Sequence, residues 1–229
     1  MITGVSLHTY FSIQHVQAAA YLSRQTAAAE TQVGQGGDPE LLRVVIMANA
    51  TSALFISVAF LEALSNELLA DALKTNGGHL KSISHTGRSL IAVLAGDDTV
   101  EKASSLSKFN LLLKAEGKNT MNLGEFPGQD VVTINKLRNN LVNYKASWLD
   151  VGTPGMVRSG NLRDSKLQSA IKGKFANRAG ANPTSADAWL GAGCTKWCVH
   201  STIAFADNFF DEFGITPLYE HVRGNLVLE

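Results

Sequence analysis

The chain has 229 residues, enough for one substantial hydrophobic core, and 45% of them are hydrophobic while 17% are charged. Its 20 basic residues balance its 20 acidic ones, so overall charge gives no case for a nucleic-acid-binding protein. Two cysteines, Cys194 and Cys198, are too few for a disulfide framework, which agrees with a reducing cytosol. No basic region precedes an apolar block at the N-terminus, so we expect no signal peptide and a cytoplasmic protein.

The first third of the chain predicts two helices. An alanine-rich run from about 13 to 31 has helical composition, and the glycines at 34, 36 and 37 end it. Asp38-Pro39-Glu40 is typical of a helix start, with an N-cap acid followed by proline at the first helical position. The second helix can continue to about Lys74, a length of about 50 Å at the helical rise per residue. Such length favours a bundle of long helices.

The segment from 44 to 61 contains no charged residue, which raises a membrane-spanning helix as an alternative. It includes four polar residues, however, and leads directly into an amphipathic stretch. A central helix packed on several sides explains both features, and we expect no membrane partner.

The middle of the chain predicts shorter helices. Residues 79 to 94 are weakly patterned and indicate one helix ending near Gly96. Asp97-Asp98 is expected to cap a further helix that continues through residues 104 to 117. A loop follows, and the next helix is expected to begin near Gln129 or Asp130.

The stretch from 135 to 148, NKLRNNLVNYKASW, is the most informative in the chain. Its apolar residues have the spacing of a buried helix face: Leu137, Leu141, Val142 and Tyr144. Arg138, Asn139 and Asn143 can share one edge of the same helix. An arginine and two amides at a core boundary indicate a site that binds an anion or another protein. The alternative is a structural polar network at a helix crossing.

This stretch resembles the RNxxxH motif of HEPN domains, a helical superfamily of ribonucleases and nucleotide-binding proteins. LRNNLVNYK is similar to the family's Leu-Arg-Asn-x-Leu-Val-His-Tyr form, with Asn143 in place of the histidine. FLEALSNELL, at 60 to 69, resembles a family helix that carries an inward-looking glutamate. We therefore expect Glu62 to pair with Arg138 across the bundle, the alternative being a solvated glutamate.

The resemblance implies a homodimer in which two copies of the motif form a cleft for RNA. Arg138 would hold a phosphate, and the family histidine would move protons during attack by the ribose 2′-hydroxyl, without metal or cofactor. Asn143 cannot titrate, so cleavage is expected to be weak or absent. Tyr144 is a poor base at its ordinary pKa near 10, and Lys145 could neutralise a phosphate.

The segment from 151 to 184 is rich in glycine and has one acid, Asp164, against six basic residues: Arg158, Arg163, Lys166, Lys172, Lys174 and Arg178. Its apolar residues predict one short amphipathic helix: Leu162, Leu167, Ile171 and Phe175. A basic arm of this kind could cover an RNA groove and neutralise phosphates. The contacts expected of it are Arg158, Arg163, Lys172 and Lys174. Because Phe175 is its only aromatic residue, base stacking is not indicated, and a solvated loop face is the alternative.

The remaining residues predict a last helix. Residues 183 to 187 are expected to cap an aromatic helix that ends near Phe213, and 214 to 229 form a tail that can pack as an extended segment. Cys194, Cys198 and His200 suggest zinc ligands, but no second cysteine pair exists, so we expect no metal.

These observations predict a single all-α domain over 1–229, a bundle of four to five long helices. Its core spans about 13–148 and 185–213, with a peripheral insertion at 151–184. The resemblance implies a homodimeric HEPN-like protein that binds RNA or a nucleotide with weak or no catalysis. It also implies a bacterial defence or stress system of the toxin–antitoxin type, in which an antitoxin would be a partner. The alternatives are an active metal-independent endoribonuclease and a structural or partner-binding bundle.

Overall fold

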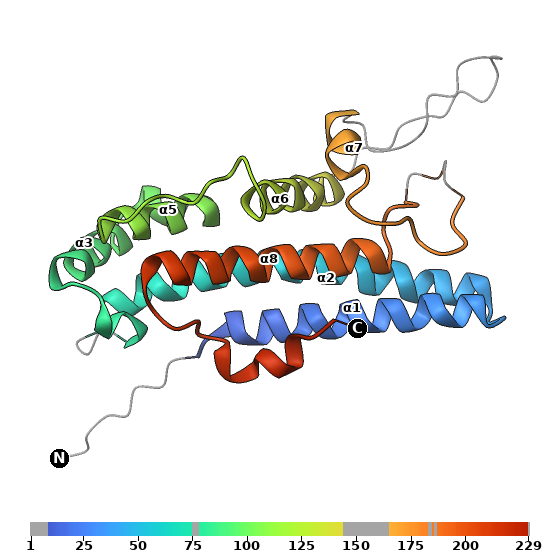
Figure 1. The fold of residues 1–229 in the computed structure, drawn as a ribbon, viewed down its shortest axis with the longest axis horizontal. Coiled ribbons are helices and arrows are strands. Elements are labelled where there is room, and N and C mark those ends of the chain that lie inside the picture. The colour runs from blue at the N-terminus through green and yellow to red at the C-terminus, as the bar shows by residue number, and fades with distance from the viewer. Residues whose placement is uncertain (1–8, 75–77, 144–164, 183–184, 186, 229) are drawn as a thin grey trace.

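The structure is a computed structural model that describes residues 9–74, 78–143, 165–182, 185 and 187–228. Within these ranges the chain is helical and contains no β-strand, which confirms the all-α prediction. Three long helices form its centre: α1 (Phe11–Gly34), α2 (Pro39–Ala72) and α8 (Ala192–Phe213). α1 and α2 are an antiparallel hairpin, and α8 lies along both of them (Figure 1).

Shorter helices cover the other side of α2 and α8 (Figure 1). They are η1 (Gly78–Ser82), α3 (His85–Ala95), α4 (Asp98–Glu101), α5 (Ser105–Ala115), α6 (Gly128–Val142) and α7 (Ser165–Ile171). The 3-10 helix η2 (Glu220–Leu226) folds back onto α1, so the tail is not the extended segment expected from the sequence.

The α1–α2 hairpin follows the local signals in the sequence. The Asp38 side chain accepts hydrogen bonds from the backbone N–H groups of Glu40 and Leu41, and Pro39 occupies the first turn, as predicted. α1 is capped differently, because a buried carboxylate on α2, Glu67, accepts the Ser12 backbone N–H at 2.9 Å. The second half of α2 lies inside the bundle and anchors α1 there.

Two main hydrophobic clusters fill most of the interior, beside a minor one of Ala29, Leu42 and Ile46 between α1 and α2. The larger joins α1, α2, α5 and α8 through aromatic and leucine side chains, among them Phe60, Leu64, Phe109, Phe205 and Phe209. The smaller surrounds α6 and α7, and it includes Leu54, Ile134, Leu137, Leu167, Trp189 and Trp197. The insertion helix α7 therefore packs against the core beside α6 through Leu167 and Ile171, two residues of its predicted apolar face.

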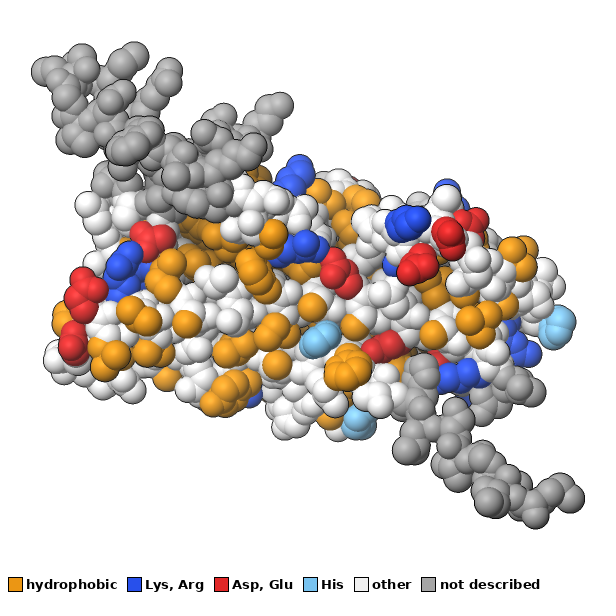
Figure 2. Space-filling model, turned by 180° about the vertical axis from the view of Figure 1, so that it is seen from behind, with side chains coloured by type: hydrophobic (Ala, Val, Ile, Leu, Met, Phe, Trp, Pro, Cys, Tyr) orange, Lys and Arg blue, Asp and Glu red, His pale blue; other side chains and the backbone are white. Residues whose placement is uncertain are grey.

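Helix α2 is long and apolar enough to cross a membrane by length and composition, with a mean hydropathy of 2.1 over 18 residues. In this structure 44% of that window is buried. Its N-terminal half still exposes Leu41, Val44 and Val45. From behind, hydrophobic side chains are spread over the surface and charged ones occur in separate groups (Figure 2).

Two predicted helix boundaries are wrong. Asp97 caps only the short α4, and Ser104 caps α5 separately, so the expected continuous helix is two helices. α8 begins at Ala192 rather than near 187, because the cap is a carboxylate from another helix. Glu30 Oε1 accepts the Ala192 N–H at 2.7 Å, and a Cβ on Gly191 would lie 2.3 Å from that oxygen.

Candidate functional site

The RNxxxH-like residues lie on the second half of α6, beside α2. Arg138 Nη2 lies 2.6 Å from Glu62 Oε1, which confirms the expected pairing of these two side chains. Their side chains remain 30% and 48% exposed, respectively. An ion pair with this much solvent contributes at most about 1 kcal/mol to folding, so its main effect is to orient the guanidinium.

The apolar side of α6 is only partly as predicted. Leu137 is fully buried and Leu141 is half-buried, but Val142 is 57% exposed. Five residues after Leu137, Val142 is rotated by about 140° around the helix, which turns it away from the core. The fourth residue of the predicted face, Tyr144, lies outside the described residues, as does Lys145.

The two asparagines of the motif differ in their roles. Asn139 is exposed on the surface of α6. Asn143 is the C-cap: its backbone N–H and its Nδ2 both donate to the Asn139 carbonyl, at 3.0 and 3.1 Å. The Asn143 side chain, at the position of the histidine in the RNxxxH pattern, therefore finishes the helix, and neither amide can exchange a proton near neutral pH.

His200, the histidine on α8, lies away from Arg138. His200 stacks on Phe126 with ring centroids 5.7 Å apart, just before the start of α6. Along the helix axis this is more than about 15 Å from Arg138. The titratable group in contact with Arg138 is instead the carboxylate of Glu62.

A buried carboxylate, Asp130, joins α6 to α8 and to the loop after α7. Its Oδ2 accepts Trp197 Nε1 at 2.6 Å and Ser201 Oγ at 3.3 Å. Lys174 Nζ lies 2.8 Å from Oδ1, as an ion contact rather than an aligned hydrogen bond. Since a buried carboxylate requires a compensating charge, Lys174 has a structural role in addition to its predicted contact with RNA.

Two further expectations concern Arg178 and the cysteines. Arg178 is 8% exposed and paired with Asp187 at 3.2 Å, so at this residue the insertion is not a solvated basic face.

Burial raises the pKa of the Cys198 thiol, as does the neighbouring Cys194, and both cysteines are fully buried. The described residues contain no cluster of three His, Cys, Asp or Glu side chains suited to a metal ion.

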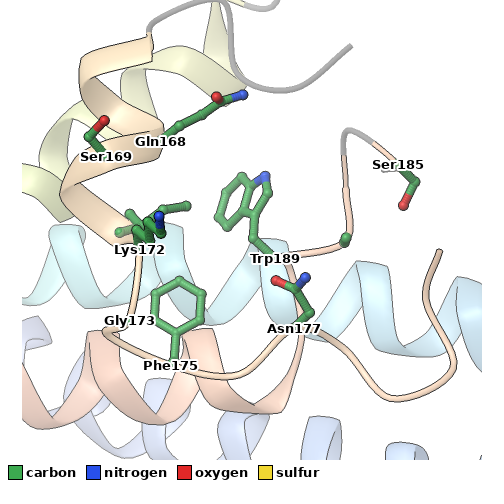
Figure 3. Close-up of a pocket in the computed structure, with 10 residues that line it drawn as sticks. Gln168, Ser169, Lys172, Gly173, Phe175, Asn177, Ser185 and Trp189 are labelled. Atoms are coloured by element: carbon green, nitrogen blue, oxygen red, sulfur yellow. The ribbon is translucent and has the colours of Figure 1, made fainter. Parts of the chain in front are cut away.

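A pocket of about 510 Å³ lies between α7 and the turn before α8 (Figure 3). The rings of Phe175 and Trp189 line it, with polar side chains around them: Gln168, Ser169, Lys172, Asn177 and Ser185. Trp189 reaches this place because the Arg178 backbone N–H donates to the Ala188 carbonyl at 2.8 Å, closing the loop. Figure 3 shows the indole between the Gln168 and Asn177 amides, with Lys172 at one side.

The sequence does not predict this pocket. Phe175 is the only aromatic residue in the basic segment, and the sequence pattern places Trp189 in the last helix. The signal that could have indicated it is a tryptophan beside a glycine-rich insertion. Of the four basic residues expected to contact RNA from this segment, Lys172 lines the pocket and Lys174 pairs with Asp130. Arg158 and Arg163 lie outside the described residues.

Comparisons of the chain with protein-family models, with curated proteins and with solved structures gave no match. The site is therefore interpreted from its own residues and from the motif at 137–144.

Proposed function

We propose that this chain is a HEPN-like homodimeric protein that binds RNA or a nucleotide, with weak or no catalytic activity. The observation that supports this best is the orientation of Arg138 by Glu62 at an accessible edge of α6. A guanidinium that is 30% exposed and held on one side keeps other N–H donors for an anion. A phosphate is the anion that the motif resemblance implies.

The pocket beside α7 supports the nucleotide part of the proposal. Phe175 offers an aromatic surface on which a base can stack, beside the largely buried Trp189, and the amides of Gln168 and Asn177 can bond to its polar edge. Lys172 is exposed and could meet a phosphate. The volume of the pocket, about 510 Å³, lies within the range of small-molecule sites.

Weak catalysis follows from the chemistry of the motif. Asn143 offers no proton, and general acid–base catalysis typically contributes about 10²- to 10⁴-fold in rate. One observation favours an active endoribonuclease as a second candidate. Glu62 is a titratable carboxylate in contact with Arg138, so it could act as the proton carrier that Asn143 is not.

The remaining parts of the proposal concern assembly and cellular role. The exposed side chain of Val142, at the end of α6, offers an apolar contact to a second copy near Arg138. The cytosol, a defence or stress system and an antitoxin partner are proposed from the motif resemblance.

RNA binding tests the proposal directly. Fluorescence anisotropy with a single-stranded RNA and with mononucleotides should detect binding by the wild type and a loss of about tenfold for Arg138→Ala, the value of one charge-assisted contact. Lys136→Ala is the matched control, because Lys136 is exposed on the same helix two residues earlier and faces another side. Equal affinities for the wild type and Arg138→Ala, or no binding by the wild type, would reject the proposal.

A second pair of variants tests the pocket. Lys172→Gln should weaken nucleotide binding, while Lys102→Gln, an exposed lysine after α4, should not. Loss of affinity in both variants would point to a nonspecific effect of charge and count against the pocket.

A further inference from the structure

A second groove, of about 630 Å³, lies along the outer face of α8. Its floor is one side of that helix, because the residues recur at helical spacing: Gly193, Lys196, Trp197, His200 and Ile203. The loop at 174–176 forms one wall. Arg223 and the segment 226–228 form the other. No residue of the RNxxxH-like edge lines this groove.

Contacts outside the cavity hold both walls in place. Arg24 of α1 donates through Nη1 to the carbonyls of Asn225 and Val227, at 2.9 and 3.0 Å, and so fastens the C-terminal wall. Arg223 donates to both oxygens of Asp207, at 2.8 and 3.1 Å. The opposite wall is held through Lys174 and the buried Asp130. A groove whose walls are tied in this way is largely formed before a ligand arrives.

The lining combines an apolar surface with positive charge. Its apolar side chains are Phe175, Trp197, Ile203, Leu226, Val227 and Leu228. Three cations also line the groove, Lys174, Lys196 and Arg223, and none of the described lining residues is acidic. Lys174 and Arg223 already have carboxylate partners, whereas Lys196 is exposed and forms no ion pair with a described acid.

We propose that this groove binds a small amphipathic anion, such as a medium-chain carboxylate. Its charged head would lie at Lys196, and its apolar body would cover Trp197 and Leu226. Charge complementarity selects the anion, since the described lining residues include three cations and no acid. The apolar floor selects the body, because a bare inorganic anion would leave that surface in water. This groove shares Phe175 with the pocket beside α7 but has no residue of the RNxxxH-like edge, and the proposal does not depend on RNA binding.

The test uses three probes that separate the effect of the ligand's charge from the effect of its alkyl chain. Isothermal titration calorimetry with dodecanoate, below its micelle concentration, should show one site per chain. Dodecyltrimethylammonium has the same chain with the opposite charge, and acetate has the charge without the chain. Both should bind at least about tenfold more weakly than dodecanoate. Equal binding of the cationic probe, or no binding of dodecanoate, would overturn the proposal.

Two surface variants locate the site. Lys196→Gln should weaken dodecanoate binding about threefold to fivefold, the effect of one solvent-exposed charge pair. Val227→Glu places a carboxylate in the wall, where Val227 is 58% exposed, and should weaken binding about tenfold. Lys102→Gln should bind like the wild type. Because all three residues are exposed, thermal melts should match the wild type, and unchanged affinity in both groove variants would place the ligand elsewhere.

Discussion

Arg138 on α6 and Glu62 on α2 are 76 residues apart in sequence, and their side chains meet with Nη2 and Oε1 2.6 Å apart. The pair lies at the boundary between core and solvent, next to the buried Leu137. It orients a guanidinium without sealing it in the interior. N–H donors of the guanidinium therefore stay accessible to solvent, as the proposed anion site requires.

The first prediction is that this pair contributes little to stability. In a double-mutant cycle with Glu62→Ala and Arg138→Ala, the coupling in the free energy of unfolding should stay below about 1 kcal/mol, because both side chains are partly exposed. Chemical denaturation of the four proteins measures it. A coupling of several kcal/mol would instead identify the pair as part of the core.

The second prediction concerns the missing histidine. Asn143→His should raise RNA cleavage by at least about 10²-fold over the wild type, since it restores a group that titrates near neutral pH. Asn143 is exposed and caps α6, so the replacement should cost at most about 1 kcal/mol of stability. Cleavage is followed on a labelled RNA in the presence of a chelator.

Adding Arg138→Ala to Asn143→His serves as the control and should remove the gained activity. If a folded Asn143→His protein cleaves no faster than the wild type, the motif lacks catalytic geometry.

The third prediction addresses assembly. Val142→Glu should weaken the proposed homodimer, because it places a charge on an exposed apolar side chain beside Arg138. Val93→Glu is the matched control, since Val93 is 73% exposed on α3, a helix that packs against α2 and α5. Sedimentation equilibrium over a range of concentrations should show a shift toward monomer only for Val142→Glu. A monomeric wild type, or an equal shift in both variants, would contradict the prediction.

The helix boundaries show what the sequence could predict and what it could not. α2 begins where Asp38 and Pro39 predict, because the cap lies within three residues of the N–H groups it accepts. α8 was placed about five residues too early because its capping carboxylate, Glu30, is 162 residues away in the chain. A cap from a neighbouring residue can be predicted from the local sequence, whereas a cap from a distant residue is known only from the tertiary fold.

The candidate site also has some features that the sequence predicts and others that it does not. The edge of α6 could be predicted because Arg138, Asn139 and Asn143 are close in sequence. The resemblance also indicated the helix that carries Glu62 as the partner of Arg138. Two other features could not be found from spacing. Lys174 lies against Asp130, and Trp189 lies opposite Phe175, only because the loop after α7 closes onto the core. The exposure of Val142 follows from helical rotation and could have been predicted by counting residues from Leu137.

The fourth prediction tests the long-range cap. Glu30→Ala should lower the free energy of unfolding by about 1–2 kcal/mol, because it removes acceptors for the backbone N–H groups of Ala192 and Ala179. Glu125→Ala, at an exposed position in the loop before α6, should change it by less than about 0.5 kcal/mol. Urea denaturation compares the two, and equal stability of both variants would mean that water replaces Glu30.

The fifth prediction is a pH dependence at the N-terminal end of α1. The Asp71 carboxylate is fully buried and accepts hydrogen bonds from the Tyr10 hydroxyl and from the backbone N–H of His79, at 2.8 and 2.9 Å. The His79 ring packs edge-on against Tyr10, with centroids 4.9 Å apart. Burial there lowers the pKa of His79 below its ordinary value of 6.5, although the charge of Asp71 acts in the opposite direction.

A lowered pKa in the folded state means that the unfolded chain takes up the proton first as the pH falls. The contribution of His79 to stability is therefore complete above pH 6.5 and declines as the pH drops through 6.5 toward the folded-state value. The melting temperature should be lower at pH 5.5 than at pH 7.5, and His79→Gln should reduce that difference while keeping the backbone hydrogen bond to Asp71. His85→Gln, at an exposed histidine that begins α3, should keep the wild-type difference. If both variants keep it, carboxylates elsewhere in the protein account for the acid sensitivity and His79 does not.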